Sequence, residues 1–394
     1  MFENWYGFAL IFDIDQEICY IIRNTSISDS LFMTPESPVI NKFLQLLDEV
    51  INNSLTDLHV SVGNFPYIRT PNRDVEPVES FGILSNNDVL RIIDFTGSIN
   101  TQELEETLEG MNYIYEFKWN RFRANVSKNN EWLAIAFRTI KKKVPTAESV
   151  GLDADMLNIL NADKGLILIT GGTGSGKTTT LVAMLDYLNR TQHRHIITVE
   201  DPIEYIFQNQ KSLIHQKQVG KHVSSFEQAI KDAMREDPDI IMVGEMRDME
   251  TISAVLTLAE TGHLVLSTLH TNDVVQTFDR LVYAFPAQMQ SQVRVQLALT
   301  LVAIIGQLIL PKIDNSGNIA AREIFMNTDA TRNLIIEWSI SHLYSIMEIG
   351  KKEGMMLMDH RLAEMFTKEL ISYETLMSHV KNPNILSQLG IIRS

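Results

Sequence analysis

The stretch GLILITGGTGSGKTTTLVAMLDYLN, Gly165–Asn189, decides the fold of this chain. Its beginning, Leu166–Thr170, is a short continuous apolar run, which is typical of a strand covered on both faces of a parallel sheet. Its end, Thr178–Asn189, reads as a helix. The segment between them has the pattern Gly-x-x-x-x-Gly-Lys-Thr, and this pattern between a buried strand and a helix predicts a phosphate-binding loop. The alternative is a glycine-rich turn with an exposed lysine.

Each part of this loop, hereafter the cradle, has a physical role. Its glycines let the backbone turn so that successive N–H groups face a β-phosphate, and the helix amino terminus adds partial positive charge. Lys177 reaches the β- and γ-phosphates, and the Thr178 hydroxyl is placed to bind Mg²⁺. ATP and Mg²⁺ are therefore the predicted cofactors. The predicted nucleotide-binding residues are Gly171, Gly172, Thr173, Gly174, Ser175, Gly176, Lys177, Thr178 and Thr179.

A second acidic group is needed at the end of a neighbouring strand, to hold the water shell of Mg²⁺. Glu245 follows the apolar run Ile240–Val243 and is predicted to fill this role. Aspartate is usual there, and the longer glutamate suits a water-mediated contact. The alternative is that Glu245 only caps the end of the strand.

Another acidic cluster, Glu200-Asp201-Pro202-Ile203-Glu204, follows the apolar run Ile196–Val199. A carboxylate at this place can act as general base toward the attacking water. Glu200 is the predicted base because it directly follows the run. Asp201 and Glu204 are candidates to orient it or to contact the metal, and a turn built around Pro202 is the structural alternative.

Two histidines, His263 and His270, bracket the predicted strand Leu264–Leu269. Their odd separation places them on opposite faces of a regular strand. His270 lies at the carboxyl end, where it could sense the γ-phosphate or serve a structural purpose. The same position argument favours His263 less.

Around this centre, strands alternate with helices and predict an α/β domain with a parallel sheet. The first 140 or so residues predict an α+β domain, and the chain from about Thr328 onward reads as helical. A lysine-rich segment with a proline, 141–151, separates the two patterns. Val295–Leu310 is predicted to be one buried core element rather than a membrane span. The elements expected in the first part are an alternating run over Phe8–Ile22, a helix over Val39–Asn52, and strands over Thr56–Val62, Tyr113–Val126 and Glu131–Ile140.

Composition narrows the functional class. The formal net charge of −15 makes nucleic acid an unexpected partner, because an acidic chain gains nothing from counterion release. Cys19 is the only cysteine, so neither an internal disulfide nor a cysteine-rich zinc site is expected. The amino terminus lacks the features of a signal peptide. We expect a soluble, cytoplasmic protein without a transmembrane segment.

Several motifs together resemble those of a known family. ITVEDPIEY (Ile197–Tyr205), DPDIIMVGEMRD (Asp237–Asp248) and GHLVLSTLHTND (Gly262–Asp273) resemble the aspartate box, Walker B motif and histidine box of type II/type IV secretion ATPases. TDATRNLIIE (Thr328–Glu337) resembles the AIRNLIRE signature of the retraction ATPases of type IV pili, the PilT family. GMMLMDHRLAEMF (Gly354–Phe366) resembles the segment that comes after this signature in the same family.

This resemblance implies a PAS-like domain over 39–140, a linker over 141–151, a RecA-like ATPase domain over 152–327 and a helical subdomain over 328–394. Residues 1–38 have no counterpart and form an extension of unknown role, whether an added strand or an interaction surface. Six copies would form a ring that binds ATP between the two domains. Glu200 would be the general base and Glu245 the Walker B acid. The resemblance also favours both His263 and His270 more strongly as catalytic residues. Arginines of the first domain, Arg121, Arg123 and Arg138, would reach the γ-phosphate; the alternative is that they only face outward from their strands.

The function implied is a hexameric motor that retracts pili and drives twitching motility. It would act at the inner face of the cytoplasmic membrane through a platform protein, with a companion motor ATPase as a further candidate partner. The alternatives are an assembly or secretion ATPase of the same superfamily, a nucleic-acid translocase and a regulatory nucleotide-binding module. Extension-type members usually carry a long amino-terminal region and a four-cysteine zinc insertion, which this chain lacks.

The sequence departs from the family pattern at three places, and the resemblance is weaker there. Gly172 stands where proline is usual, and Ser127–Trp132 (SKNNEW) replaces a glycine-rich turn next to the arginines. Ile336 stands where the retraction signature has an arginine. The local geometry of the arginines and the narrower assignment to retraction both depend on these positions.

Overall fold

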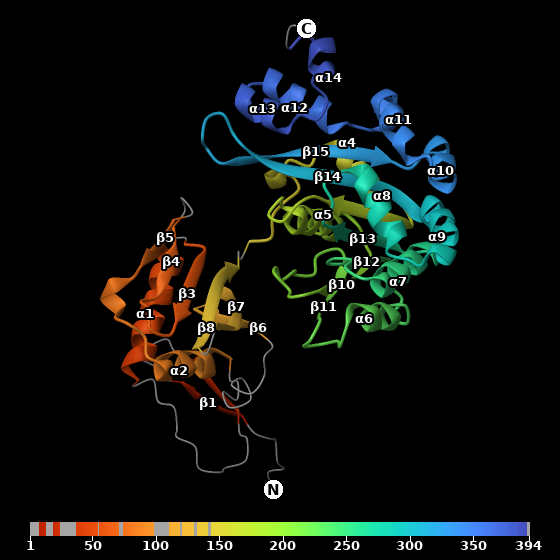
Figure 1. Cartoon of the computed structure of the whole chain (residues 1–394). Helices are drawn as coiled ribbons and strands as arrows, with labels where there is room; N and C mark the ends of the chain where they lie inside the picture. Colours follow the sequence, from red (N-terminus) through yellow and green to blue (C-terminus); the bar gives the residue numbers. More distant parts are fainter. Residues whose placement is uncertain are drawn as a thin grey trace. The chain divides into compact units, whose positions relative to one another are not determined.

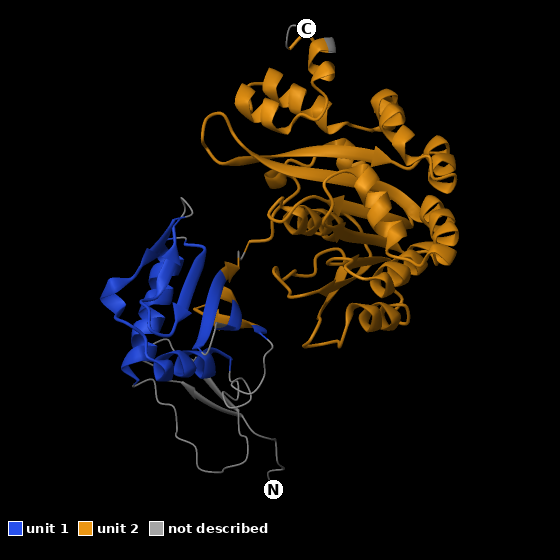
Figure 2. Cartoon of the chain, in the orientation of Figure 1, with its two compact units in different colours: residues 1–112, 124–138 blue, residues 113–123, 139–394 orange. Residues whose placement is uncertain are grey.

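A computed structural model describes residues 8–12, 19–23, 37–53, 55–70, 74–97, 110–118, 120–129, 132–140 and 143–391. The chain divides into two compact units (Figure 2), one of Met1–Asn112 with Ala124–Arg138 and one of Tyr113–Arg123 with Thr139–Ser394. In the amino-terminal extension, β1 (Phe8–Phe12) and β2 (Cys19–Arg23) pair as an antiparallel hairpin, so the alternating run contains two short strands. Residues 13–18 between them lie outside the described part.

The amino-terminal sheet has six strands in the order β5-β4-β3-β8-β7-β6. Helices α1 (Pro38–Asn52) and α2 (Asn86–Gly97) pack beside it (Figure 1). The helix predicted over Val39–Asn52 is confirmed, and Phe43, Leu47 and Val50 on its apolar face are fully buried. The strands are β3 (Asp57–Ser61), β4 (Tyr67–Arg69), β5 (Val75–Pro77), β6 (Met111–Phe117), β7 (Asn120–Asn129) and β8 (Trp132–Ile140), with a 3₁₀ turn at Glu79–Phe81.

One prediction in this region was wrong. The single strand expected over Tyr113–Val126 is two strands, β6 and β7, because the chain turns at Lys118, whose φ is +46°. A left-handed residue cannot continue an extended strand, and lysine carries no signal for that conformation.

The second unit is built on a seven-stranded sheet in the order β11-β10-β12-β13-β9-β14-β15. Neighbours are parallel from β11 to β14, and only β15 runs antiparallel, so the predicted parallel sheet is confirmed. Every residue of β9, β12 and β13 is buried, as a continuous apolar run requires. The strands are β9 (Gly165–Thr170), β10 (His195–Glu200), β11 (Leu213–Gln218), β12 (Ile240–Val243), β13 (Leu264–Leu269), β14 (Leu301–Pro311) and β15 (Asn318–Met326).

Helices cover both faces of this sheet, and β9 explains why. Leu166 and Leu168 point into one core, with α7, α8 and α9, whereas Ile167 and Ile169 point into the other, with α5. The helices of this part are α4 (Ala154–Asn158), α5 (Lys177–Thr191), α6 (Phe226–Ala233), α7 (Met249–Glu260), α8 (Val274–Tyr283) and α9 (Ala287–Thr300), with 3₁₀ turns at Glu148–Val150 and Ile159–Asn161.

The apolar run Val295–Leu310 is not one element, which corrects the prediction. Helix α9 ends at Thr300 and β14 begins at Leu301, whose backbone is already extended. The strand half is largely buried, whereas Leu299 on the helix is 65% exposed. Among the described residues, no helix combines the length and apolarity that crossing a membrane would take.

From Thr328 to residue 391 the chain forms helices and turns, as predicted. Helix α12 packs on β15, and the cluster that contains Leu310, Ala321 and Leu362 joins the terminal helices to the β14–β15 hairpin (Figure 1). These elements are α10 (Asp329–Ile336), α11 (Leu343–Ile349), α12 (Met358–Thr367), α13 (Tyr373–His379) and α14 (Pro383–Gln388), with 3₁₀ turns at Ile340–His342 and Gly350–Glu353.

Candidate nucleotide-binding site

The cradle runs from the carboxyl end of β9 to the first turn of α5. Gly171, Gly174 and Gly176 have φ of +149°, +79° and +81°, values that residues other than glycine rarely adopt. A Cβ at Gly171 would also stand 2.5 Å from the Gln307 carbonyl oxygen. Gly172 differs, because its φ is not positive and a Cβ there would meet no atom within 4 Å. The position where proline is usual therefore does not demand glycine in this chain.

Lys177 begins α5 and points back over the cradle. Its Nζ donates hydrogen bonds to the carbonyl oxygens of Gly171 and Gly172, each at 2.9 Å, and lies 3.4 Å from Nδ1 of His270. Burial lowers the pKa of Lys177, and the negative charge of Glu245 acts against that shift. The cradle thus holds one positive charge where phosphate oxygens would enter.

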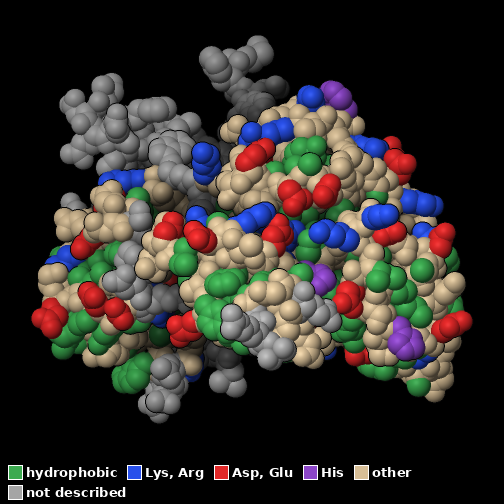
Figure 3. Space-filling model, turned by 90° about the horizontal axis from the view of Figure 1, so that it is seen from above, with side chains coloured by type: hydrophobic (Ala, Val, Ile, Leu, Met, Phe, Trp, Pro, Cys, Tyr) green, Lys and Arg blue, Asp and Glu red, His purple; other side chains and the backbone are tan. Residues whose placement is uncertain are grey.

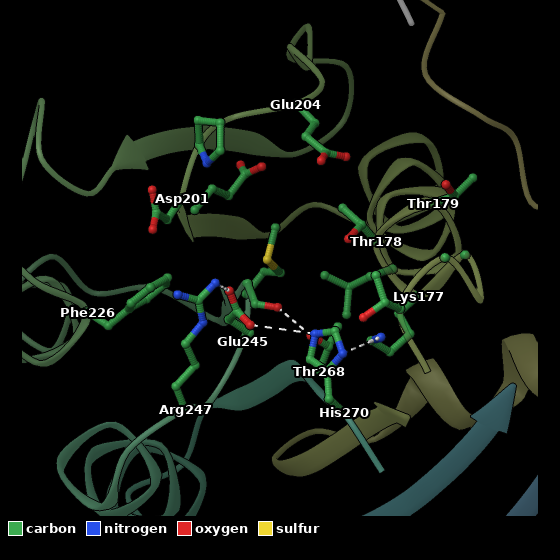
Figure 4. Close-up of a pocket in the computed structure, with 18 of the residues that line it drawn as sticks. Lys177, Thr178, Thr179, Asp201, Glu204, Phe226, Glu245, Arg247, Thr268 and His270 are labelled. Atoms are coloured by element: carbon green, nitrogen blue, oxygen red, sulfur yellow. Dashed lines mark hydrogen bonds and ion pairs between the residues drawn. The ribbon is translucent and has the colours of Figure 1, made fainter. Parts of the chain in front are cut away.

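A cavity of about 520 Å³ adjoins the cradle (Figure 4). The carboxyl ends of parallel strands meet at one edge of a sheet, and this edge forms much of its wall. The structure therefore brings the cradle together with both predicted acidic groups. The lining includes Thr173, Gly174, Gly176, Lys177, Thr178, Thr179, Glu200, Asp201, Glu204, Phe226, Glu245, Arg247, Thr268 and His270.

Glu200, the predicted base, is the last residue of β10 and is only 4% exposed. Its Oε1 accepts hydrogen bonds from Oγ1 of Thr198 at 2.6 Å and from Nε2 of Gln216 at 3.0 Å. Burial raises the pKa of Glu200, and these hydrogen bonds only partly offset the rise. A carboxylate with a raised pKa in a cavity wall has the property expected of a general base.

Glu245 has a different environment, because its partners are basic. One carboxylate oxygen pairs with the guanidinium of Arg247, and the other lies 3.7 Å from Nε2 of His270. His270 also faces Lys177, so a chain of contacts runs from Arg247 through Glu245 and His270 to the cradle lysine (Figure 4). Burial and the charge of Lys177 lower the pKa of His270, which favours the neutral form of its ring.

Sequence reasoning missed Arg247 and Thr268. Arg247 belongs to the motif GEMRD and lies two residues after Glu245, a spacing that could have suggested a shared site. Thr268 lies within β13 and its hydroxyl donates to the Gly244 carbonyl oxygen at 2.7 Å, which ties β13 to the loop that carries Glu245.

His263 lies at the other end of β13 from His270 and does not line the cavity. Its Nδ1 lies 3.1 Å from the carbonyl oxygen of Leu258 and 3.3 Å from Oγ1 of Thr261, both at the end of α7. Six strand residues separate the two histidines, which corresponds to roughly 20 Å. These contacts place His263 at the end of α7, where it contacts groups of the last turn of the helix.

The three predicted arginines lie on the amino-terminal sheet. Arg138 on β8 donates from Nε to Asp57 at 2.7 Å, and this contact crosses to the neighbouring strand β3. Burial favours the neutral form of Asp57, but the hydrogen bonds from Arg138 and Thr56 prevail and lower its pKa. Arg121 and Arg123 share one face of β7, and Arg121 pairs with Glu116 at 3.3 Å. The catalytic role of all three remains a prediction.

A parallel sheet covered by helices, a glycine-rich cradle between strand and helix, and carboxylates at the ends of adjacent strands define a P-loop protein of the RecA-like class. Residues 141–376 match the family model described as "Type II/IV secretion system protein". The chain is 41% identical over 340 residues to the type IV pilus retraction ATPase PilT of Pseudomonas aeruginosa, across 86% of this chain and 98% of that protein.

Solved structures agree with this placement. The crystal structure of the pilus retraction motor PilT with bound ADP superposes with a TM-score of 0.80 at 38% identity, covering 88% of this chain and 98% of that one. The ATPase DotB of Legionella pneumophila gives a TM-score of 0.73 at 25% identity, covering 89% of this chain and 97% of that one. The chain belongs to the PilT family of the type II/IV secretion system proteins.

Proposed function

We propose that this protein is an ATP-hydrolysing motor that powers retraction of type IV pili. The observation that carries the proposal is the near end-to-end similarity to a retraction ATPase, at 41% identity over 98% of that protein. The cavity supports the chemistry, because it joins a phosphate cradle to two carboxylates of different character. The motor works as a homohexamer at the inner face of the cytoplasmic membrane and acts on a platform protein there.

In this mechanism the cradle holds the phosphates and Glu200 accepts the proton. Lys177 exchanges its carbonyl partners for oxygens of the β- and γ-phosphates. Water attacks the γ-phosphorus, the bond to the β–γ bridging oxygen breaks, and the water proton passes to the Glu200 carboxylate. Burial of Glu200 favours that transfer because it strengthens the affinity of the carboxylate for a proton.

The residues around Thr178 fit Mg²⁺ held mainly by the nucleotide. Within the described ranges no group of three or more carboxylate, histidine or cysteine side chains could form a metal cage. Magnesium sites of nucleotide enzymes typically use one or two protein ligands, waters and phosphate oxygens. Thr178 and Glu245, with Asp201 as a further candidate, suit that arrangement, in which the ion would neutralise charge on the transferring phosphate.

The proposal also assigns the arginines of the amino-terminal domain to the γ-phosphate. Arg123 is the stronger candidate, because Arg121 already pairs with Glu116 and Arg138 with Asp57. An arginine that arrives only when the site closes would stabilise charge that develops on the phosphoryl group. Hydrolysis would then depend on ring assembly.

A secretion motor is the second candidate, favoured by the match of residues 141–376 to the family model described as "Type II/IV secretion system protein". A nucleic-acid translocase has less support. Basic side chains are interspersed with acidic ones on the face shown in Figure 3, whereas a phosphate backbone would favour a continuous basic stripe.

A deletion strain tests the proposal. Cells without the protein should carry surplus pili and lose twitching motility, and a Glu200→Gln copy should not restore motility although the wild-type copy does. Cells without any pili would identify an assembly motor instead, and normal piliation with a secretion defect would identify a secretion motor. Steady-state phosphate release by the purified protein tests the ATPase activity separately.

A further inference from the structure

A buried arginine lies behind the cradle, outside the cavity that Glu200 and Glu245 line. Arg322 belongs to β15 and is 3% exposed. Its Nε donates to Oε1 of Gln307 at 2.8 Å, and its Nη2 lies 3.3 Å from Oγ1 of Thr180 in the first turn of α5. The guanidinium of Arg322 therefore contacts α5, the helix that follows the cradle.

Gln307, on β14, extends the contact to the cradle itself. Its Nε2 donates to the carbonyl oxygen of Ser175 at 2.5 Å, while its Oε1 accepts from both Arg322 and Thr180. Gln307 also leaves no room for a side chain at two cradle glycines. A Cβ at Gly171 would stand 2.5 Å from the backbone carbonyl oxygen of Gln307, and a Cβ at Gly176 would stand 3.0 Å from its Nε2. Gln307 is 2% exposed, and its side-chain oxygen faces Arg322 while its nitrogen faces the cradle at Ser175.

The other end of the guanidinium holds the segment that precedes the ATPase core. Nη1 donates to the carbonyl oxygen of Gly151 at 2.9 Å, and Nη2 donates to that of Val150 at 2.7 Å. Both carbonyls belong to the linker, 141–151, which comes after β8 along the chain. A cavity of about 660 Å³ is lined by this same linker end, by Gly174, Gly176 and Thr179 of the cradle and by Gln307 and Arg322.

We propose that Arg322 and Gln307 are positioning residues that connect the linker to the cradle, so that the arrangement of the linker sets the affinity of the cradle for nucleotide. The path runs from Val150 and Gly151 through Arg322 and Gln307 to Ser175. Its hydrogen bonds are partly buried at the two linker carbonyls and buried from Arg322 to Ser175. The proposal deepens the ATPase function proposed above and rests on it. It gives a movement of the linker a physical route to the loop that holds phosphate.

This path of hydrogen bonds from Val150 and Gly151 through Arg322 and Gln307 to Ser175, hereafter the relay, differs in its chemistry from an ordinary ion pair. All four hydrogen-bond partners of Arg322 among the described residues are neutral oxygens. Burial lowers the pKa of Arg322 to about 10, so the side chain remains charged near neutral pH. A buried cation without a paired carboxylate is a costly way to fill space, and an apolar side chain would do so more cheaply. What arginine adds here is a rigid set of donors aimed at two segments at once.

Two variants of the full-length protein test the relay. Arg322→Met removes all the donors, and Gln307→Glu keeps an oxygen for Arg322 but loses the donor to Ser175. The readouts are binding of a fluorescent ADP analogue, KM and kcat for ATP, and the thermal unfolding midpoint. Arg235→Met, at an exposed arginine of the same unit, is the matched control.

Both relay variants should bind the ADP analogue at least about tenfold more weakly and raise KM by a similar factor, because each loses charge-assisted or buried hydrogen bonds. Gln307→Glu should do so with an unfolding midpoint near that of wild type, because its carboxylate pairs with Arg322. Arg322→Lys should recover part of the affinity, and Arg235→Met should change nothing. Should Arg322→Met fail to fold, Gln307→Glu decides alone.

Wild-type nucleotide affinity in Gln307→Glu would overturn the proposal and leave the relay a purely structural contact. A failure of the ATPase activity on which this proposal rests has a different signature, because the wild-type protein would then release no phosphate. Binding of the ADP analogue would still report on the relay in that case.

Discussion

Replacing the predicted base, Glu200→Gln, should abolish turnover while nucleotide binding and folding persist. The structure explains why the fold should tolerate this change. Thr198 and Gln216 both donate to Oε1 of Glu200, and an amide oxygen can accept both hydrogen bonds in the same place. The backbone N–H of Glu204 also donates to the carboxyl group, and this is the contact that an amide nitrogen can lose.

The magnitudes come from these contacts. One lost hydrogen bond costs about 1 kcal/mol, which lowers the unfolding midpoint of a chain of this size by only a few degrees. The neutral amide also avoids the burial cost that raises the pKa of Glu200, so the net change in stability should be smaller still. A positioned general base, by contrast, contributes about 10²- to 10⁴-fold to the rate. The expected variant is therefore folded, binds ATP and is nearly inactive.

The assay is steady-state phosphate release at saturating ATP and Mg²⁺, with binding of a fluorescent ADP analogue and the unfolding midpoint measured on the same samples. Glu204→Gln is the matched control, since it removes a second carboxylate from the same cavity wall and should lower kcat much less. In the wild-type protein, kcat should fall on acidification at a pH above the ordinary pKa of glutamate, because the base works only when ionised and its pKa is raised. A Glu200→Gln variant with wild-type kcat would refute the assignment of Glu200, whatever its pH profile.

Three further predictions test other parts of the molecule. Lys177→Ala should weaken binding of the ADP analogue by about 10²-fold or more, since it removes the cation that faces the phosphates, and unchanged binding would place the nucleotide elsewhere. Glu323 is buried with its pKa raised from 4.5 to about 7, so its contribution to the free energy of unfolding is full below the lower value and declines by about 3 kcal/mol as the pH rises through the higher one. Glu323→Gln should remove that part of the decline between about pH 5 and pH 8 in urea unfolding, and an unaltered pH slope would contradict the shift. Arg138→Gln should lower the unfolding midpoint because it leaves the buried carboxylate of Asp57 without its main partner, whereas loss of hydrolysis at an unchanged midpoint would place Arg138 in the active site.

The sequence predicted that the cradle, Glu200 and Glu245 lie together, because the information for this arrangement is local. A buried strand, a glycine-rich turn and a helix are contiguous between Gly165 and Asn189. Glu200 and Glu245 each come at the end of an apolar run. Parallel strands then bring their carboxyl ends to one edge without any further specification. The side chains of β9 alternate between the two cores because successive residues of a strand point to opposite faces.

The features that the sequence could not predict depend on contacts between distant segments. Gln307 and Ser175 are 132 positions apart, and Arg322 and Val150 are 172 apart, so no local pattern connects them. The ends of β6 and α9 were misplaced for a related reason. Lys118 and Leu301 carry no residue preference for a turn or a strand start, and tertiary packing sets these boundaries instead.

The two carboxylates of the site illustrate how environment assigns a role that residue type leaves open. Glu200 is buried among neutral donors, a hydroxyl, a side-chain amide and a backbone N–H, so nothing compensates its charge fully and its affinity for a proton rises. Glu245 lies between the cation of Arg247 and the ring of His270, and its side chain is 18% exposed, an environment that suits the proposed role of holding water around a metal. Exchanging these environments would exchange the roles. In the proposed mechanism Glu200 is the general base because it ends β10 in a buried place among neutral donors such as Thr198 and Gln216. A variant that introduced a cation beside Glu200 should lower both the pKa of Glu200 and the kcat of the protein.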